Sequence, residues 1–212
     1  MSKQGGAGTR AYHHIKQQLF EGRLAEGTFL AEGAVAEELG VSRTPVREAL
    51  QRLDAEKLVS LVPGRGALVP HVTIRTMREV MQARELIEVY ALENIDTPAP
   101  ELVEELRSVL KQQGSAHGDA VDFIVQDRGF HQRLVDAAGN QVIAELYSSL
   151  RDRQTLLGVR AVTTETSRFD EIEREHRLIV DAIESGDHAA AVNALRIHLQ
   201  TSVDVLMAGL SA

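Results

Sequence analysis

The chain has 212 residues, 43% of them hydrophobic and 25% charged, as in an ordinary globular protein with one large domain or two smaller ones. It has no cysteine, which excludes disulfides and thiolate metal ligands. It also has no apolar run long enough to span a membrane and no signal-peptide core, so we expect a cytoplasmic protein with no membrane partner. The net charge of −8 is unevenly distributed. Residues 1–75 carry ten Lys and Arg against eight Asp and Glu, whereas the remainder carries thirteen against twenty-three. Only the first part is therefore electrostatically suited to binding the phosphates of nucleic acid.

The first part of the chain predicts a tail and three short helices. Residues 1–9 hold three glycines and are expected to form a disordered tail. Apolar residues at helical spacing predict one helix after this tail, a second over residues 32–39 and a third shortly beyond. Gly40 suits a left-handed cap after the second helix, and Ser42 or Thr44 is expected to cap the third. The third helix would bury a stripe formed by Val46, Ala49, Leu50 and Leu53.

A hairpin and a series of longer helices are expected after these. The sequence Pro63-Gly64-Arg65-Gly66 is a turn signal between two β-prone runs and predicts a short hairpin, or wing. Beyond a linker near residues 70–73, apolar periodicity predicts helices near 74–95, 99–113, 119–138, 140–160, 168–185 and 188–208. The fold class is therefore mostly α, with a winged helix-turn-helix over residues 10–71 followed by an antiparallel all-helical bundle over residues 72–212.

The third helix has the layout of a DNA recognition helix. Arg43, Thr44 and Arg47 lie at its N-terminal end and off the apolar stripe, where side chains can meet base edges and first-turn amides favour phosphate. The fork of an arginine matches the O6 and N7 acceptors of guanine. Arg65, at the tip of the hairpin, could enter a neighbouring groove or contact phosphate. From these features alone, a merely solvated helix face is the alternative.

The residue string itself favours DNA binding. The segment Gly40–Leu53 (GVSRTPVREALQRL) closely resembles the winged helix-turn-helix of the GntR family of bacterial transcription regulators, and the wing Gly64-Arg65-Gly66 fits as well. The resemblance spans about residues 10–70. It implies that operator DNA is contacted by Arg43, Thr44, Arg47, Arg65 and Gly66. Gly33 is a departure, because many members carry a polar or basic residue there that also touches DNA.

Four side chains of metal-binding type interrupt the apolar stripes of the later helices. Asp127 and His131 are four residues apart on one helix face, so their side chains project together. His176 and His198 each lie on the apolar face of a later helix. A buried carboxylate is costly unless it is paired or coordinated, and the four together fit a divalent ion such as zinc, nickel, manganese or iron. Taken singly, each histidine is more simply a core residue hydrogen-bonded to a neighbour.

Two further residues are candidates for binding an effector. Arg84 lies on an apolar helix face, where it pairs either with Glu88, four residues on, or with the carboxylate of a bound small molecule. Asn140 follows Gly139 and either caps the next helix or faces a cavity. Both alternatives stay open for each residue.

The second part of the chain also resembles a known domain. The similarity is to the FCD ligand-binding domain of the FadR-like branch of the GntR family, and covers about residues 74–208. It rests on Asp127-x3-His131, Glu175-His176, His198, the segment 83–88 and Ala138-Gly139-Asn140. It implies a helical bundle with an effector cavity beside a metal held by Asp127, His131, His176 and His198. Some relatives lack the histidines and bind acyl-CoA, so their presence here favours a metal-dependent sensor of a small organic acid.

These features together predict a sequence-specific transcription regulator, a repressor, that binds double-stranded operator DNA as a homodimer. A small carboxylate effector at the metal, assisted by Arg84, would change the operator affinity. Two alternatives remain: a regulator with a purely structural metal, and a metal-dependent hydrolase or isomerase of small acids. An enzyme is disfavoured, because the sequence shows no clear general base and no nucleophile elbow.

Overall fold

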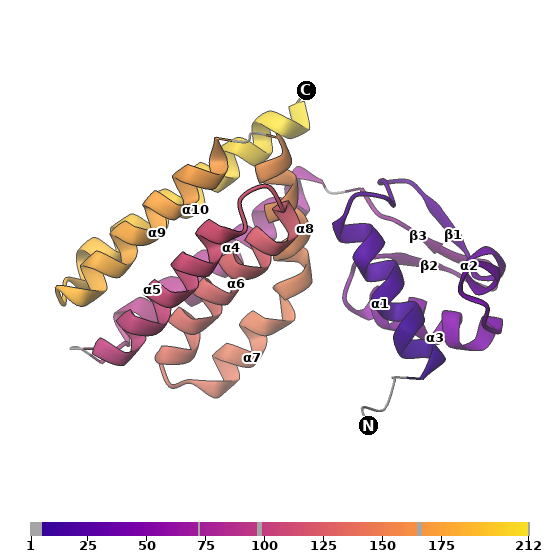
Figure 1. Ribbon diagram of the computed structural model, residues 1–212, viewed down its shortest axis with the longest axis horizontal. Coiled ribbons are helices and arrows are strands. Elements are labelled where there is room, and N and C mark those ends of the chain that lie inside the picture. The colour runs from indigo at the N-terminus through magenta and orange to yellow at the C-terminus, as the bar shows by residue number, and fades with distance from the viewer. Residues whose placement is uncertain (1–5, 72, 97–98, 165–166, 212) are drawn as a thin grey trace. The chain divides into compact units, whose positions relative to one another are not determined.

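The computed structural model describes residues 6–71, 73–96, 99–164 and 167–211. The chain divides into two compact units, Met1–Val72 and Thr73–Ala212 (Figure 1). None of the helices in the described ranges combines the length and the apolar character that a membrane span requires.

The first unit contains three helices and a small sheet. In chain order its elements are α1 (Ala7–Phe20), β1 (Phe29–Ala31), α2 (Glu32–Leu39), α3 (Arg43–Ala55), β2 (Ser60–Val62) and β3 (Gly66–Leu68). The strands form an antiparallel sheet in the order β1-β3-β2. The core is fully buried and includes Ile15, Val46, Leu50, Leu53 and Leu58. The expected winged helix-turn-helix is therefore confirmed as the architecture of this unit.

Glycine is required where the wing returns to the sheet. Gly66 pairs with Ala31 of β1 and with Val62 of β2, and its φ of +146° lies in a region that other residues rarely adopt. A β-carbon at this position would overlap the carbonyl oxygen of Leu30. The strands can therefore approach this closely only because residue 66 has no side chain.

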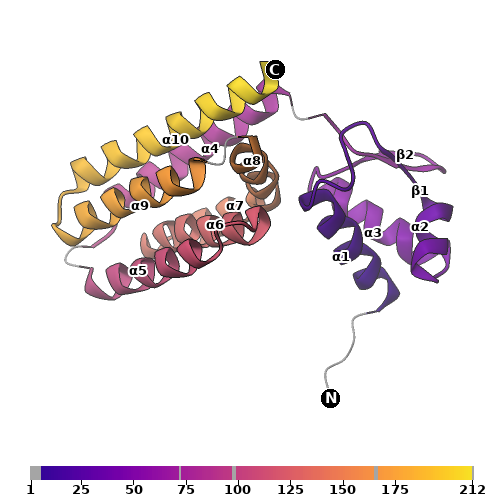
Figure 2. The ribbon, with the colours of Figure 1, turned by 45° about the horizontal axis from the view of Figure 1, so that its top comes forward.

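The second unit is a bundle of helices, as predicted (Figure 2). Its elements are α4 (Ile74–Glu93), α5 (Pro100–Ser115), α6 (Ala120–Ala137), α7 (Gln141–Ser149), α8 (Arg151–Thr164), α9 (Arg168–Glu184) and α10 (His188–Ser211). The long helices α9 and α10 lie side by side, α4 packs against α10, and α5 packs against both α6 and α9. The fully buried apolar core includes Leu106, Phe123, Phe130, Leu134, Ile179 and Leu195.

Several predicted boundaries are confirmed closely. Helix α2 spans the predicted residues 32–39 and ends at Gly40, which is left-handed with a φ of +62°. Ser42 is the N-cap residue of α3, but its side chain makes no capping hydrogen bond. The short strand β1 was not predicted, because its three residues carry no turn signal and are ordered by pairing with β3.

Two predictions about the elements are wrong. Residues 7–9 of the expected tail form the first turn of α1, where Gly8 lies close to Pro45 and Glu48 of α3, so packing orders them. Residues 1–5 of that tail lie outside the described residues. The single helix expected over residues 140–160 is two helices, because the amide of Leu150 donates to the Tyr147 carbonyl oxygen (3.0 Å) and closes α7 with a tight turn.

Candidate metal centre and recognition helix

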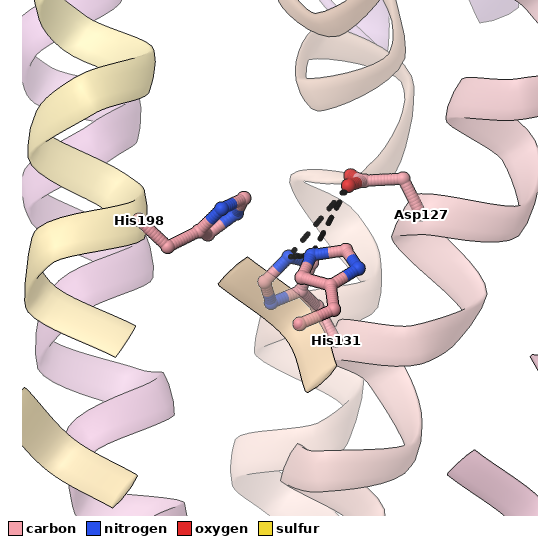
Figure 3. A group of neighbouring side chains, drawn as sticks. Asp127, His131 and His198 are labelled. Atoms are coloured by element: carbon pink, nitrogen blue, oxygen red, sulfur yellow. Dashed lines mark hydrogen bonds and ion pairs between the residues drawn. The ribbon is translucent and has the colours of Figure 1, made fainter. Parts of the chain in front are cut away.

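The four predicted metal ligands meet in the core of the second unit (Figure 3). Asp127 and His131 come from α6, His176 from α9 and His198 from α10. All four residues are buried, and one ligand atom from each lies within 4.8 Å of all the others. Among the described residues this is the one such group of His, Asp and Glu side chains that could hold a metal ion.

The facing atoms are the Nε2 nitrogens and one carboxylate oxygen. His176 Nε2 lies 3.2 Å from His131 Nε2 and 3.4 Å from Asp127 Oδ1. His131 Nε2 lies 3.9 Å from the same oxygen. Asp127 Oδ1 is buried and has no hydrogen-bond partner among the described residues. The Phe130 ring stacks on the His176 ring, with centroids 4.1 Å apart, and so orients that imidazole.

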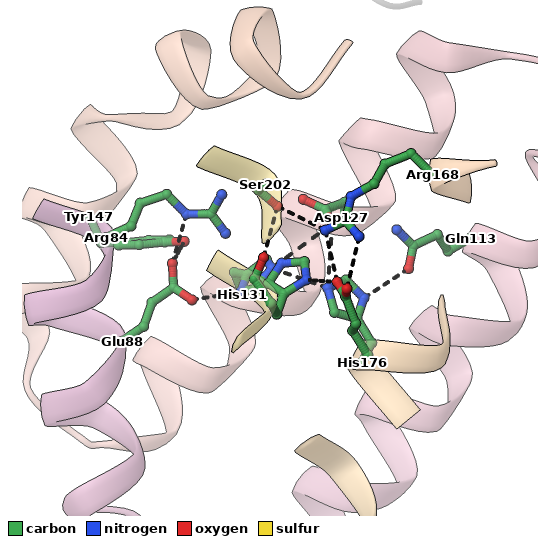
Figure 4. A network of polar contacts seen from close by, with 11 residues as sticks. Arg84, Glu88, Gln113, Asp127, His131, Tyr147, Arg168, His176 and Ser202 are labelled. Atoms are coloured by element: carbon green, nitrogen blue, oxygen red, sulfur yellow. Dashed lines mark hydrogen bonds and ion pairs between the residues drawn. The ribbon is translucent and has the colours of Figure 1, made fainter. Parts of the chain in front are cut away.

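The outward-facing nitrogen of each imidazole contacts an acceptor (Figure 4). The pairs are His131 Nδ1 with Glu88 Oε2 at 2.6 Å, His198 Nδ1 with Glu175 Oε2 at 2.7 Å and His176 Nδ1 with Gln113 Oε1 at 3.1 Å. A neutral imidazole that donates from Nδ1 carries its lone pair on Nε2. The three Nε2 atoms then converge beside a carboxylate oxygen, and the rings of His131 and His198, whose Nδ1 atoms face carboxylates, present lone pairs there.

This convergence fits a cation. Lone pairs and a carboxylate at such distances repel one another unless a positive charge lies between them. Three imidazole nitrogens and one carboxylate oxygen are ligands that suit zinc and other borderline divalent ions. The donor set and its buried, unpartnered oxygen therefore fit a divalent metal, as the sequence predicts.

The protonation of the imidazoles is consistent with metal binding. Burial lowers the pKa of His176 well below its ordinary value, and repulsion from the imidazoles of His198 and His131 in their protonated forms lowers it further. Burial also lowers the pKa of His198, although its hydrogen bond to Glu175 acts in the opposite direction. Both side chains are therefore neutral at pH 7, the form that binds a metal.

Glu88 of α4 lies behind His131 and is completely buried. Its Oε1 accepts hydrogen bonds from Arg84 Nε (2.9 Å) and from the Tyr147 hydroxyl (2.7 Å). Burial alone would raise the pKa of Glu88, but the charge of Arg84 and the contacts with His131 and Tyr147 hold it well below its ordinary value. The pairing of Arg84 with Glu88 was one of two predicted alternatives and is confirmed.

A second buried arginine supports His198. Arg168 of α9 is fully buried and donates to both oxygens of Glu175, each at 2.8 Å, and to the Ser202 hydroxyl at 3.0 Å. His198 and His131 are thus each backed by a carboxylate that an arginine holds in place (Figure 4).

A small cavity opens beside the centre. It is lined by Met81, Arg84, Ile124, Asp127, Gln154, Leu157, Gly158, Ile172, His198, Ser202 and Leu206. Among the described residues, the Arg84 side chain makes one hydrogen bond, from Nε to Glu88. Both of its terminal amino groups therefore remain available to a ligand. Gln154 is also buried, and its Nε2 has no hydrogen-bond partner there. The cavity volume is about 30 Å³, space for about one water-sized group.

Asn140, the other predicted effector residue, is the N-cap of α7. Its Oδ1 accepts a hydrogen bond from the backbone amide of Ile143 at 3.2 Å, which was the capping alternative. The described residues that line the cavity beside Asp127 do not include it.

Sequence reasoning did not single out Gln113, Tyr147, Gln154 or Arg168. Gln113 continues the apolar stripe of Val103, Leu106 and Leu110, and Arg168 precedes Glu175 by seven residues on the face that carries Ile172. Polar residues on apolar stripes were therefore the available signal, as they were for the histidines.

In the first unit, the predicted DNA-contacting side chains are exposed. Arg43, Thr44 and Arg47 lie in the first turns of α3, and Arg65 lies at the hairpin turn. Gly66 is buried, and its backbone geometry is explained by the approach of β1.

Two arginines of α3 contact the start of α2. Arg47 donates to both oxygens of Glu32, each at 2.8 Å, and these hydrogen bonds lower the pKa of that carboxyl. The Arg43 guanidinium lies over Gly33, 3.4 Å from the position of a β-carbon there. A side chain at position 33, where the sequence departs from many family members, would therefore contact the Arg43 guanidinium.

Comparison with known proteins agrees with both parts of this description. Residues 7–69 match the family described as "Bacterial regulatory proteins, gntR family", and residues 79–201 match "FCD domain". Over 197 residues, the chain is 32% identical to an "Uncharacterized HTH-type transcriptional regulator in unstable DNA locus" of Streptomyces ambofaciens. The matched region covers 91% of this chain and 82% of that protein. Over 199 residues, it is 29% identical to the "Gluconate operon transcriptional repressor" of Bacillus subtilis (strain 168), with the same coverage.

The fold is shared with solved structures. That of Escherichia coli McbR/YncC superposes with a TM-score of 0.75 at 24% identity, covering 96% of this chain and 98% of that one.

Proposed function

The chain belongs to the GntR family of bacterial regulatory proteins and carries an FCD domain, and from this premise we propose that it is a repressor whose operator affinity is set by a small carboxylate. The carboxylate would bind beside a divalent metal ion in the helical unit. One observation carries the metal: three imidazoles and the unpartnered Asp127 Oδ1 converge in the core, with one ligand atom from each residue within 4.8 Å of all the others.

The first unit supplies the contacts to DNA. Arg43, Thr44 and Arg47 lie in the first turns of α3, where a recognition helix meets base edges in the major groove. Arg65 at the hairpin tip would reach the DNA backbone or the adjoining groove. Gly66 is buried, so its part would be to shape the turn that presents Arg65. A homodimer would place two such helices on a palindromic operator, with a half-site spacing set by the protein.

The second unit supplies the metal site. Asp127, His131, His176 and His198 hold the ion, while Glu88 and Glu175 orient two of the imidazoles. The bound ion would offer a Lewis-acidic position to an oxygen of the effector. Zinc, nickel, manganese and iron all accept this donor set, so metal content measured after expression would identify the ion.

Arg84 is the proposed anchor for the effector carboxylate. Its Nε is held by Glu88, which leaves the terminal amino groups for an anion in the cavity. Since the cavity volume is about 30 Å³, it has room for about one water-sized group and is too small for a whole carboxylic acid as it stands. A larger acid requires displacement of side chains that line it. A relative that is named a gluconate operon repressor supports an organic acid as the class of effector. Asn140 caps α7, and it would contact the effector only after such a displacement.

Effector binding would shift the helices that hold the centre and so alter operator affinity. Couplings of this kind are typically worth about 1–3 kcal/mol, or roughly a 5- to 150-fold change in affinity. If the metal is purely structural, no acid changes operator affinity. The enzyme alternative has no support from the relatives, which are transcription regulators.

The test is thermal melting of the full chain, loaded with metal or treated with a chelator, against sugar acids, hydroxy acids, dicarboxylates and amino acids. A compound that binds only the native state raises stability by mass action, and the shift should require the metal. The same compound should then change operator affinity in a gel-shift titration. Stabilisation by metal alone, with no effect of any acid, would favour the structural metal.

A further inference from the structure

We propose that Glu88 commits His131 to the tautomer that binds metal, with Arg84 and Tyr147 as the donors that keep Glu88 in its orientation. Glu88 does not face the centre, so it is a positioning residue, one that acts through His131. The inference rests on the metal site of the proposed function, but its main test needs no metal.

The two oxygens of Glu88 have separate tasks. Oε1 accepts from Arg84 Nε and from the Tyr147 hydroxyl, while Oε2 contacts His131 Nδ1 at 2.6 Å. Glu88 and His131 are both 0% exposed, so water cannot replace either partner. The three partners come from α4, α7 and α6, so the carboxylate is fixed by three different helices (Figure 4).

The chemistry of the contact decides the tautomer. Arg84 Nε forms an ion pair with Oε1 at 2.9 Å, which favours the ionised carboxylate, and an ionised carboxylate only accepts hydrogen bonds. His131 Nδ1 must then carry the proton, which places the lone pair of a neutral ring on Nε2. That atom faces His176 Nε2 and Asp127 Oδ1.

The partner of His176 does not impose such a choice. His176 Nδ1 contacts Gln113 Oε1 at 3.1 Å, and the Gln113 Nε2 atom is buried with no partner among the described residues. An amide turned by half a rotation would donate to the same nitrogen instead of accepting from it. The carboxylates behind His131 and His198 are therefore the fixed elements of the centre, and the amide behind His176 is the adaptable one.

Replacing Glu88 by glutamine should reverse the tautomer of His131. Arg84 and Tyr147 are donors, so they retain the amide oxygen of the new side chain as their acceptor. Its NH₂ group then faces His131 Nδ1, which must accept, and the proton moves to His131 Nε2. An Nε2–H group points hydrogen at the centre in place of a lone pair, so this proton must leave Nε2 before the atom can bind a metal.

The experiment measures histidine tautomers by long-range ¹H–¹⁵N NMR on the metal-free full chain labelled with ¹⁵N-histidine, with the His131 signals assigned from the His131→Asn variant. We expect the Nδ1–H pattern for His131 in the wild type and the Nε2–H pattern in Glu88→Gln. Metal affinity of Glu88→Gln, measured by competition with a chromophoric chelator, should fall by about 10- to 100-fold. The matched control is Glu85→Gln, on the same helix, where Glu85 pairs with Arg196 at the surface. It should leave the tautomer and metal affinity unchanged.

An Nε2–H pattern for His131 in the wild type would overturn the inference without any variant, even if Glu88→Gln fails to fold. An unchanged tautomer in a folded Glu88→Gln protein would overturn it as well. The proposed function is judged separately: wild type with the Nδ1–H pattern that binds no divalent metal would refute the metal site and leave the tautomer assignment intact.

Discussion

Arg47 and Glu32 form a two-point ion pair between the recognition helix and the start of α2, with both N···O distances at 2.8 Å. The arginine is exposed, and the backbone amide of Glu32 donates to the Arg65 carbonyl oxygen at 3.4 Å. One residue of α2 therefore contacts both the recognition helix and the turn of the wing. Glu32 limits the directions in which Arg47 can point, so the guanidinium is already partly oriented for the contact with DNA that we propose.

The first prediction concerns Arg47. Arg47→Ala should weaken binding to a specific operator by about 1–3 kcal/mol, because a bidentate contact to a base is lost. Fluorescence anisotropy with a labelled operator and a scrambled duplex measures this. Arg177→Ala, which removes an exposed arginine of α9, is the control and should leave both affinities unchanged. An equal loss on both duplexes would assign Arg47 to phosphate instead of base readout.

The second prediction concerns the wing. Gly66→Ala should destabilise the first unit by more than about 1 kcal/mol, because a left-handed backbone is combined with an overlap against β1. Gly64→Ala is the matched control, since its φ is +70° but no atom lies within 4 Å of the added carbon. Urea unfolding of both variants is the measurement. Equal destabilisation would show that the approach of Leu30 does not matter.

The third prediction separates the effector from the metal. Arg84→Lys keeps the positive charge, but an ammonium paired with Glu88 has no second amino group to offer an anion. We expect acid affinity to fall about tenfold, or ~1.4 kcal/mol, and metal affinity to stay the same. Calorimetric titrations of metal and then of acid test both. Arg107→Lys, in a surface ion pair with Asp181 and Glu184, is the control. Unchanged acid affinity would remove Arg84 from the effector site.

The fourth prediction follows from the lowered pKa values of His176 and His198. Below the ordinary value of 6.5, these side chains take up protons in the unfolded chain but not in the folded one. The free energy of unfolding of the metal-free protein should therefore decrease as the pH falls below about 6.5, and the folded state regains this stability above it. Urea unfolding at several pH values checks this. His176→Gln should flatten the dependence, and a wild type with no such dependence would contradict it.

Most of the helical framework could be predicted from the sequence. The period of apolar residues identified α2 to the residue and most of the bundle within a few positions. Asp127 and His131 could be paired because four residues separate them on one helix. His176 and His198 could be added only through their positions on apolar stripes, because the contacts between α6, α9 and α10 are not local in sequence.

What could not be predicted depends on tertiary packing. The break at Leu150 has no glycine or proline to mark it, and the order of residues 7–9 comes from contacts with α3. Glu88 was visible only as a helical neighbour of Arg84. Its contacts with His131 and Tyr147 join residues 43 and 59 positions apart, a relationship that no local pattern encodes.

Helix α4 spans the distance between the start of the second unit and the candidate metal centre. It begins at Ile74, directly after the segment that joins it to the DNA-binding unit, and Thr73 caps it by accepting from the Thr76 amide at 3.0 Å. At the rise of an α-helix, Glu88 lies roughly 20 Å along the axis from this start. A hydrogen-bonded helix resists compression along that axis, so it moves as a rigid element. We predict that a displacement at the Glu88 carboxylate would move the start of α4, at Ile74, by a similar amount along the axis.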